Sequence, residues 1–192
     1  MILVGLTGGV ATGKSAVAEM FSRLGVATAD TDLLVHGLLR KGEGVYSKII
    51  KIFGRDILKK NGEIDRKKLA GVVFASSSYA TKLRRKLELI IHPAVYREVM
   101  KMAKKKGRGI FIIEVPLLFE VGWDKKVDLT ITVVSTPAVQ RKRCKRPLVR
   151  RIGLQLPLWK KAAMADFVID NSGNLADTRL QVKKIYNEIL CA

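Results

Sequence analysis

The chain has 192 residues, of which 48% are hydrophobic and 28% are charged, so it can bury a core and its composition excludes wholesale disorder. Lysine and arginine total 36 against 17 acidic residues, which gives a net charge of +19. This excess is typical of binding to nucleic acid, an anionic membrane surface or an anionic small molecule, or of a solvated basic surface. The two cysteines, Cys144 and Cys191, exclude a disulfide scaffold and favour a reduced, cytoplasmic protein. No apolar run is long enough to cross a bilayer, so we expect no membrane partner.

Short segments rich in Val, Ile and Leu predict strands that are buried on both faces, as in a parallel sheet. The predicted strands are Ile2–Thr7, Val26–Ala29, Gly109–Val115, Leu129–Ser135 and Phe167–Asp170. The helical patterns between and after them are Lys14–Leu24, Asp32–Arg40, Pro137–Arg143 and Leu175–Leu190. Strands that alternate with helices predict an α/β fold, with a parallel sheet of about five strands flanked by helices.

Residues 42–106 interrupt this alternation, because they show helical patterns and no convincing strand. The predicted helices are Tyr46–Phe53, Lys67–Ala75, Tyr79–Ile91 and Pro93–Lys106, with turns at Asn61-Gly62 and His92-Pro93. We therefore expect a single domain, with a helical insertion at about 42–106. The α/β core of the domain is then formed by residues 1–40, 107–138 and 162–192. A helical insertion of this kind commonly builds a substrate site.

The segment after the first strand reads Gly-Gly-Val-Ala-Thr-Gly-Lys-Ser, which matches the phosphate-loop pattern G-x-x-x-x-G-K-[ST]. Glycines let backbone N–H groups turn toward phosphate oxygens, and the N-terminus of the following helix adds partial positive charge. The pattern predicts that Lys14 contacts the β- and γ-phosphates of ATP and that the Ser15 hydroxyl binds Mg²⁺. The predicted nucleotide-binding residues of this loop are Gly8, Gly9, Val10, Ala11, Thr12, Gly13, Lys14 and Ser15.

Acidic residues follow two of the predicted strands, at the sheet edge where ligands bind in open α/β folds. Asp30 and Asp32 come after the second strand, and Glu114 lies at the end of the third. A carboxylate there can accept a proton from an attacking hydroxyl or hold Mg²⁺ through water, although either aspartate could instead cap the next helix. We predict that Asp32 is the general base, and that Asp32 or Glu114 contributes to the Mg²⁺ site.

Segments along nearly the whole chain resemble, in the same order, the dephospho-coenzyme A kinase family of P-loop small-molecule kinases. They are Leu6-Thr7-Gly8-Gly9, Asp30-Thr31-Asp32, Phe53-Gly54, Gly62-Glu63-Ile64-Asp65-Arg66, Val73-Phe74, His92-Pro93, Pro116-Leu117-Leu118-Phe119-Glu120, Gln140 with Arg143, and Ala165-Asp166-Phe167-Val168-Ile169-Asp170-Asn171. The phosphate loop is shared by many families. The Pro-Leu-Leu-Phe-Glu and Ala-Asp-x-x-Ile-Asp-Asn segments are much more specific.

The resemblance implies a P-loop kinase that uses ATP and Mg²⁺ to phosphorylate the ribose 3′-hydroxyl of dephospho-coenzyme A. It implies that Asp32 lies beside that hydroxyl, that Arg143 is a lid arginine near the transferred group, and that Asn171 lies near the adenine of ATP. The residues that it places at the acceptor site are Arg66, His92, Leu117, Leu118 and Glu120. From the residues alone, Arg66 could equally form a surface ion pair and His92 could be a packed turn residue.

Residues 139–161 correspond to a basic lid in this resemblance, and they include nine lysines and arginines and no acidic residue. The segment is about seven or eight residues shorter than the family pattern. Lids of this kind close over bound substrates. Either the lid is truly short or residues of a longer lid are absent from the sequence. The roles of Arg146, Arg150 and Arg151 therefore stay open.

Other function classes are also compatible with a phosphate loop. One alternative is another small-molecule kinase, for a nucleoside, nucleotide, shikimate or gluconate, and a purely regulatory nucleotide-binding protein is a further one. A nucleic-acid-binding ATPase would use the basic lid, but aromatic residues make up only 6% of the chain and none lies within Arg141–Arg146. We therefore expect small-molecule substrates and no nucleic acid, in a monomer or weak homo-oligomer.

Overall fold

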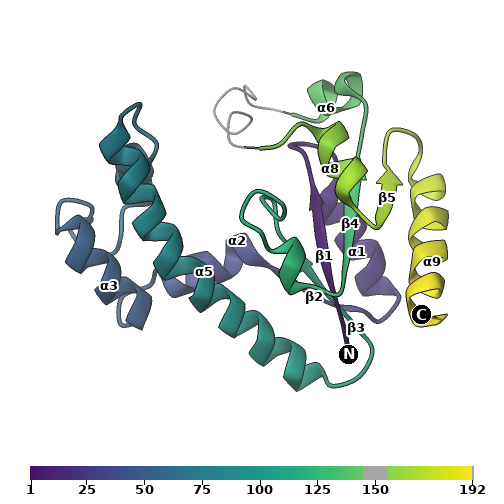
Figure 1. Ribbon diagram of the computed structural model, residues 1–192, viewed down its shortest axis with the longest axis horizontal. Coiled ribbons are helices and arrows are strands. Elements are labelled where there is room, and N and C mark those ends of the chain that lie inside the picture. The colour runs from purple at the N-terminus through teal and green to yellow at the C-terminus, as the bar shows by residue number, and fades with distance from the viewer. Residues whose placement is uncertain (145–154, 192) are drawn as a thin grey trace. The chain divides into compact units, whose positions relative to one another are not determined.

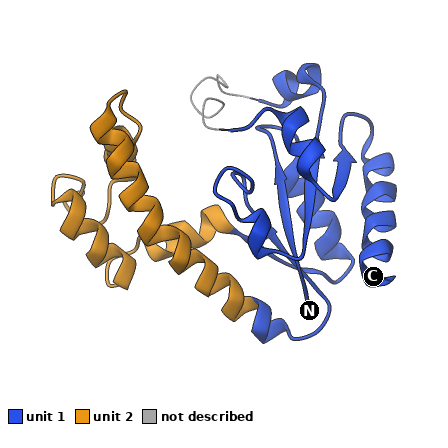
Figure 2. Cartoon of the chain, viewed as in Figure 1, with its two compact units in different colours: residues 1–30, 103–192 blue, residues 31–102 orange. Residues whose placement is uncertain are grey.

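Figure 1 shows a computed structural model of the chain, which describes residues 1–144 and 155–191. The chain forms two compact units, coloured separately in Figure 2. The first unit consists of Met1–Asp30 with Ala103–Ala192, and the second of Thr31–Met102. Among the described residues, no helix is both long enough and apolar enough to cross a membrane.

The first unit is built on a five-stranded sheet in the order β2-β3-β1-β4-β5, with all neighbouring strands parallel. The strands are β1 (Ile2–Gly8), β2 (Ala27–Asp30), β3 (Ile110–Glu114), β4 (Leu129–Val134) and β5 (Phe167–Asp170). The predicted strands are thus confirmed, with their ends shifted by at most one residue. Continuous burial of β3 explains why an unbroken apolar run predicted it correctly.

The register of the sheet gathers functional groups at its carboxyl edge. Glu114 at the end of β3 pairs with Leu6 of β1 on one side and with Asp30 of β2 on the other. The phosphate loop begins at the end of β1, so Asp30 and Glu114 follow the strands beside it. This arrangement matches the rule that open α/β sheets bind ligands at the carboxyl ends of their strands.

Helices α1 (Lys14–Arg23) and α9 (Leu175–Cys191) cover one face of the sheet (Figure 1). Phe21 of α1 and Ile189 of α9 are fully buried there against the alternate side chains of β1. On the other face Leu118 packs so closely on Gly5 that a Cβ at this position would lie 2.8 Å from a leucine methyl group. The close approach explains glycine in the middle of β1, where it weakens a strand intrinsically.

Among the described residues, the first unit also contains three shorter helical segments. They are the 3₁₀ turn η1 (Asp124–Lys126), α6 (Pro137–Arg143) and α8 (Leu158–Met164). Helix α6 was predicted with its observed bounds, and the Thr136 hydroxyl caps it by accepting from the Val139 N–H. Helix α8 was not predicted, because its buried residue is a lysine, Lys161, which hides the usual apolar stripe.

The second unit contains α2 (Thr31–Leu38), α3 (Gly44–Phe53), α4 (Arg66–Val73) and most of α5 (Ser78–Lys106). Its core gathers apolar residues from all four helices, including Ile49 and Leu69. The predicted turn at Asn61-Gly62 is present, since Gly62 has a φ of 80° and its N–H donates to the Lys59 carbonyl.

The predicted break at His92-Pro93 is wrong, because α5 is one continuous helix of 29 residues with Pro93 inside it. Proline removes the hydrogen bond to the carbonyl four residues earlier, which belongs to Leu89. Leu89 is 75% exposed, so water can satisfy that carbonyl. Burial of Ala94 and Val95 directly after the proline stabilises the continued helix.

Candidate active site

Two glycines of the phosphate loop, Gly8 and Gly13, pack too closely against their neighbours to carry a side chain. A Cβ on Gly8 would lie 2.7 Å from the Thr12 hydroxyl, and a Cβ on Gly13 would lie 2.1 Å from the Asn171 amide nitrogen. Gly13 also has a φ of 89°, a conformation that other residues rarely adopt. Within the loop, the Thr12 hydroxyl donates to the Gly9 carbonyl at 3.0 Å. Both glycines are therefore required by the local packing of the loop.

Lys14 and Ser15, which begin α1, both contact one carboxylate oxygen of Glu114. The Lys14 Nζ lies 2.5 Å from Glu114 Oε2, and the Ser15 hydroxyl donates to the same oxygen at 3.2 Å. Glu114 is only 6% exposed, so its charge lies in a poorly solvated place where the ion pair is strong. The structure thus brings together three of the predicted site residues.

The donor atoms at this point fit a magnesium ion. Mg²⁺ prefers oxygen ligands and usually binds through one or two protein groups together with substrate phosphates. Ser15 Oγ and the Glu114 carboxylate supply such oxygens beside the loop. Over residues 1–144 and 155–191, no group of three or more His, Cys, Asp and Glu side chains forms an independent metal cage.

Arg143 and Asn171 meet at the carbonyl of Thr12. The Asn171 side-chain amide donates to this carbonyl at 2.8 Å, and the Arg143 guanidinium donates to it at 3.5 Å and to the Asn171 carbonyl at 2.9 Å. The Thr178 hydroxyl donates to the Asn171 side-chain oxygen at 3.0 Å. Asn171 is buried, so in this structure it stabilises the phosphate loop through these hydrogen bonds. Its predicted place near the adenine stays a prediction.

Replacing Asn171 by alanine would remove these contacts from the loop. We expect the free energy of unfolding to fall by about 1–3 kcal/mol, because the buried Thr12 carbonyl and Thr178 hydroxyl both lose a partner. We also expect weaker ATP binding, since the loop loses support. Urea denaturation and ATP titration measure the two effects. Asn187→Ala, on the exposed side of α9, is the matched control, and equal behaviour of both variants would contradict this role.

A second cluster lies after β3, where Lys161 of α8 is completely buried. Its Nζ lies 2.8 Å from Glu120 Oε1 and donates to the Pro116 carbonyl at 2.7 Å. Burial lowers the pKa of Lys161, and the hydrogen bond and charge of Glu120 partly oppose that shift. In the sequence, Lys161 is one of the nine cations of the predicted lid, and no charge pattern distinguishes it from the exposed Lys160.

The remaining predicted residues of this region lie within the same segment. Leu118 is buried against Gly5, and Leu117 is half-buried. Glu120 is 12% exposed at its side chain and also accepts from the Leu156 N–H at 2.8 Å. Their predicted contacts with an acceptor substrate stay predictions. Arg146, Arg150 and Arg151 of the predicted lid lie outside the described residues.

The second unit carries the other predicted acceptor residues. Asp32 is exposed in the first turn of α2. Arg66 is the first residue of α4, and it follows Asp65, whose side chain caps the helix by accepting from the N–H groups of Lys67 and Lys68. The hydrogen bond from the Lys68 N–H, which has the largest effect, and that from the Lys67 N–H lower the pKa of Asp65. The cap therefore stabilises the start of α4, where Arg66 lies.

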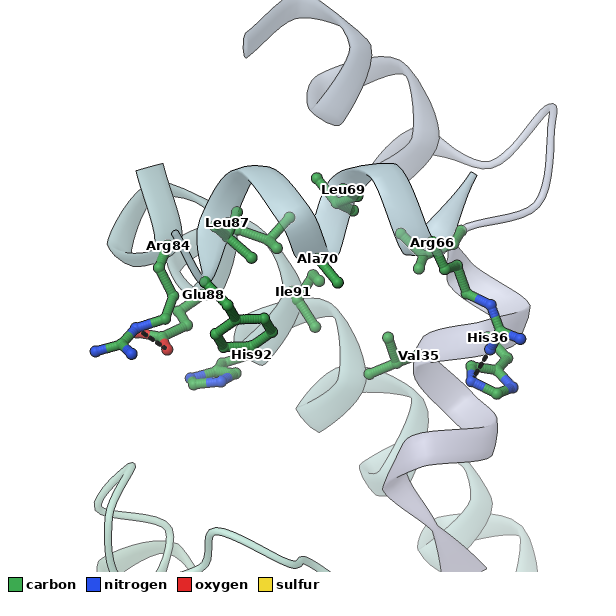
Figure 3. Close-up of a pocket in the computed structure, with 13 residues that line it drawn as sticks. Val35, His36, Arg66, Leu69, Ala70, Arg84, Leu87, Glu88, Ile91 and His92 are labelled. Carbon is green, nitrogen blue, oxygen red and sulfur yellow. Dashed lines mark hydrogen bonds and ion pairs between the residues drawn. The ribbon is translucent and has the colours of Figure 1, made fainter. Parts of the chain in front are cut away.

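Arg66 and His92 both line a pocket of about 240 Å³ in the second unit, at opposite sides of it (Figure 3). The lining residues are Val35, His36, Leu39, Arg66, Leu69, Ala70, Val73, Phe74, Arg84, Leu87, Glu88, Ile91 and His92. Arg66 contacts His36 at one end of the pocket, and Arg84 forms an ion pair with Glu88 at the other, with 3.6 Å between Arg84 Nε and Glu88 Oε1 (Figure 3). The pocket is thus apolar inside and charged at both ends.

Sequence reasoning missed His36, Arg84 and Glu88. For His36 a signal was available, because it follows Asp32 by four residues in α2 and so lies on the same side of that helix. Arg84 and Glu88 have the same spacing in α5, which by itself is typical of an ordinary surface ion pair. Only the packing of α2, α4 and α5 shows that these residues share a pocket.

Known proteins resemble both the sequence and the fold. A family model described as dephospho-CoA kinase matches residues 2–177. The chain belongs to the dephospho-CoA kinase family. A dephospho-CoA kinase of Aquifex aeolicus is 43% identical over 193 residues, which cover 97% of this chain and 96% of the relative.

Solved structures agree with this membership of the dephospho-CoA kinase family. The protein TT1252 from Thermus thermophilus has a TM-score of 0.84 at 27% identity, with 97% of each chain covered. A dephospho-CoA kinase from Campylobacter jejuni has a TM-score of 0.68 at 28% identity, covering 97% of this chain and 96% of that one. A shikimate kinase from Bacteroides thetaiotaomicron, at 14% identity and a TM-score of 0.51, covering 100% of this chain and 99% of that one, shares the fold alone.

These findings confirm the predicted family and the predicted α/β P-loop fold. The chain is an enzyme of the dephospho-CoA kinase family, and its kinase class is that of the P-loop enzymes. The alternatives of a shikimate-type kinase and of a nucleic-acid-binding ATPase are not favoured.

Proposed function

We propose that this chain transfers the γ-phosphoryl group of ATP to the ribose 3′-hydroxyl of dephospho-coenzyme A, giving coenzyme A and ADP. The observation that carries the proposal is the convergence of Lys14 and Ser15 on Glu114 at the phosphate loop, in a member of the dephospho-CoA kinase family. Phosphoryl transfer needs in-line positioning and neutralisation of charge more than covalent chemistry. The groups at this loop are of the kind that supply both.

Each group at the loop has a chemical role in this proposal. Lys14 leaves Glu114 to bind the β- and γ-phosphates, and Arg143 adds positive charge near the transferred group. Ser15 and Glu114 hold Mg²⁺, which when bound neutralises charge on the phosphate oxygens. Asp32 accepts the proton of the 3′-hydroxyl as that oxygen attacks phosphorus.

The pocket of the second unit is our proposed acceptor site. Dephospho-coenzyme A combines an uncharged pantetheine arm with an anionic diphosphate, and the pocket combines apolar walls with the guanidinium groups of Arg66 and Arg84. Guanidinium groups bind phosphate oxygens through paired hydrogen bonds. His92 lies at the same pocket, and the residues Leu117, Leu118 and Glu120 are assigned to acceptor binding by the family resemblance.

Replacing Arg66 by alanine therefore has a specific expected result. We expect the KM for dephospho-coenzyme A to rise by roughly 10–100-fold, which corresponds to the loss of one hydrogen bond between charged groups. The KM for ATP should stay within about twofold, because Arg66 does not belong to the phosphate loop. Arg85→Ala is the matched control, since Arg85 is exposed and does not line the pocket. An unchanged acceptor KM in the Arg66 variant would remove Arg66 from the acceptor site.

An acceptor panel tests the function itself. Purified protein with ATP and Mg²⁺ is given dephospho-coenzyme A, shikimate, gluconate or a nucleoside, and ADP release is followed. We expect rapid turnover with dephospho-coenzyme A alone. Turnover with another acceptor, or salt-sensitive binding of DNA without any kinase activity, would contradict the proposal.

We further infer a cytoplasmic enzyme that acts as a monomer or weak homo-oligomer, without nucleic acid or membrane partners. The small number of cysteines, only Cys144 and Cys191, supports a reducing compartment. Apart from Lys160 and Lys161 of α8, the basic residues of segment 139–161 have a sufficient reason in this proposal, because two strongly anionic substrates must be held together.

A further inference from the structure

Three elements of the first unit meet at the carbonyl of Pro116. The Thr7 hydroxyl donates to this oxygen at 3.3 Å, and the Lys161 ammonium donates to it at 2.7 Å. Thr7 is the next-to-last residue of β1, directly before the phosphate loop, and Pro116 follows the end of β3. The carbonyl therefore links the strand that carries the loop, the segment Pro116–Glu120 and helix α8.

Lys161 also fixes the far end of that segment. Its ammonium pairs with Glu120 Oε1, which accepts from the Leu156 N–H as well. The Lys161 carbonyl accepts from the Thr132 hydroxyl of β4 at 3.2 Å, which anchors α8 on the sheet. One buried side chain thus holds both Pro116 and Glu120.

Helix α8 also touches the phosphate loop. A Cβ built on Gly9 would lie 3.6 Å from a methyl carbon of Leu158, the first residue of α8. This is ordinary van der Waals distance, so Leu158 packs over the loop. The position of α8 is consequently coupled to the loop by packing and to Pro116–Glu120 by Lys161.

A lysine at this position is not explained by stability alone. Removing an ammonium group from water has a large free-energy cost, and a well-packed apolar residue of similar volume is often at least as stabilising as a buried ion pair. What the ion pair supplies is directional contacts to Pro116 and Glu120, which an apolar side chain cannot make. The benefit is therefore geometric.

We propose that Lys161 is a positioning residue for phosphoryl transfer, which fixes the segment Pro116–Glu120 against the phosphate loop and so sets where the acceptor binds. This inference rests on the proposed function, which assigns that segment to the acceptor site. Lys161 itself touches neither phosphate nor acceptor in this role. It acts through Pro116 and Glu120.

Lys161→Met tests the inference, because methionine keeps an apolar stem of similar length and removes the ammonium. We expect kcat/KM for dephospho-coenzyme A to fall by roughly 10–100-fold, mainly through a higher acceptor KM, because small displacements at a reacting site have effects of this size. The KM for ATP should stay within about twofold, since the contacts of Lys14, Thr12 and Asn171 at the loop remain.

The matched control is Lys160→Met, which removes the same charge from an exposed neighbour in α8 and should behave like the wild type. Kinetics are measured well below the unfolding midpoint of each variant, since a loss of folded enzyme lowers kcat and leaves both KM values unchanged. If Lys161→Met is insoluble, Lys161→Gln, which keeps a neutral donor, takes its place. The expected result is again a higher KM for dephospho-coenzyme A and an unchanged KM for ATP.

The outcomes distinguish the positioning role of Lys161 from the proposed function of the enzyme. An acceptor KM that rises while the ATP KM is preserved supports the positioning role. Unchanged KM values, equal rises in both, or kinetics like those of Lys160→Met overturn it. If the wild type and Lys160→Met fail to phosphorylate dephospho-coenzyme A, the proposed function itself is wrong.

Discussion

Replacing Lys14 by alanine is expected to lower kcat by about 10²–10³-fold or more, because the charge on the transferring phosphoryl group then loses its nearest fixed cation. The KM for dephospho-coenzyme A should change far less, since Lys14 lies at the phosphate loop and the proposed acceptor pocket lies in the other unit. Steady-state kinetics with each substrate varied in turn measure both effects. Lys104→Ala, which removes an exposed lysine from the end of α5, is the control for charge.

Replacing Lys14 also removes its ion pair with Glu114, which affects stability. Glu114 is 6% exposed in the wild type, and without Lys14 this buried carboxylate loses an ion pair, so the thermal midpoint should fall as well. The double variant Lys14→Met with Glu114→Gln removes both charges and should recover most of that stability while staying inactive. If activity returned together with stability, Lys14 would have a structural role only.

Replacing Asp32 by asparagine is expected to lower kcat by about 10²–10⁴-fold, the usual contribution of a general base. Asparagine keeps the shape of the side chain but cannot accept the proton of the 3′-hydroxyl. Asp32 is exposed in the first turn of α2, so the variant should remain folded with a thermal midpoint close to that of the wild type. The KM for ATP should also be preserved.

Asp56→Asn provides the comparison, because it makes the same change at an exposed aspartate of the same unit that does not line the pocket. Its kinetics should match the wild type. Near-normal turnover of Asp32→Asn would remove Asp32 from the role of base and would direct attention to Asp30, which pairs in register with Glu114 at the sheet edge.

Local patterns were sufficient for the sheet and the phosphate loop. Buried parallel strands need apolar residues on both faces, so their sequences are short apolar runs that few other structures require. The loop needs glycine at particular positions for steric reasons, and Gly8 and Gly13 show contacts that no side chain could accommodate. Where a pattern has a single physical cause of this kind, the sequence predicts the structure well.

Features that depend on distant packing were not predictable in this way. Pro93 suggested a helix end, but burial of Ala94 and Val95 on one side and water on the other keep α5 continuous. Lys161 looked like one basic lid residue among nine, although its partners Glu120 and Pro116 lie about forty residues earlier in the chain. The lining of the acceptor pocket depends similarly on how α2, α4 and α5 pack.

The most direct test of the central claim is product analysis of one reaction. Wild-type protein is incubated with ATP, Mg²⁺ and dephospho-coenzyme A, with Lys14→Ala as the blank, and the products are separated and examined by phosphorus NMR. The account predicts that ADP and coenzyme A form one for one, with the new phosphomonoester on the ribose 3′-oxygen. ADP without coenzyme A, or phosphate on another oxygen, would contradict it.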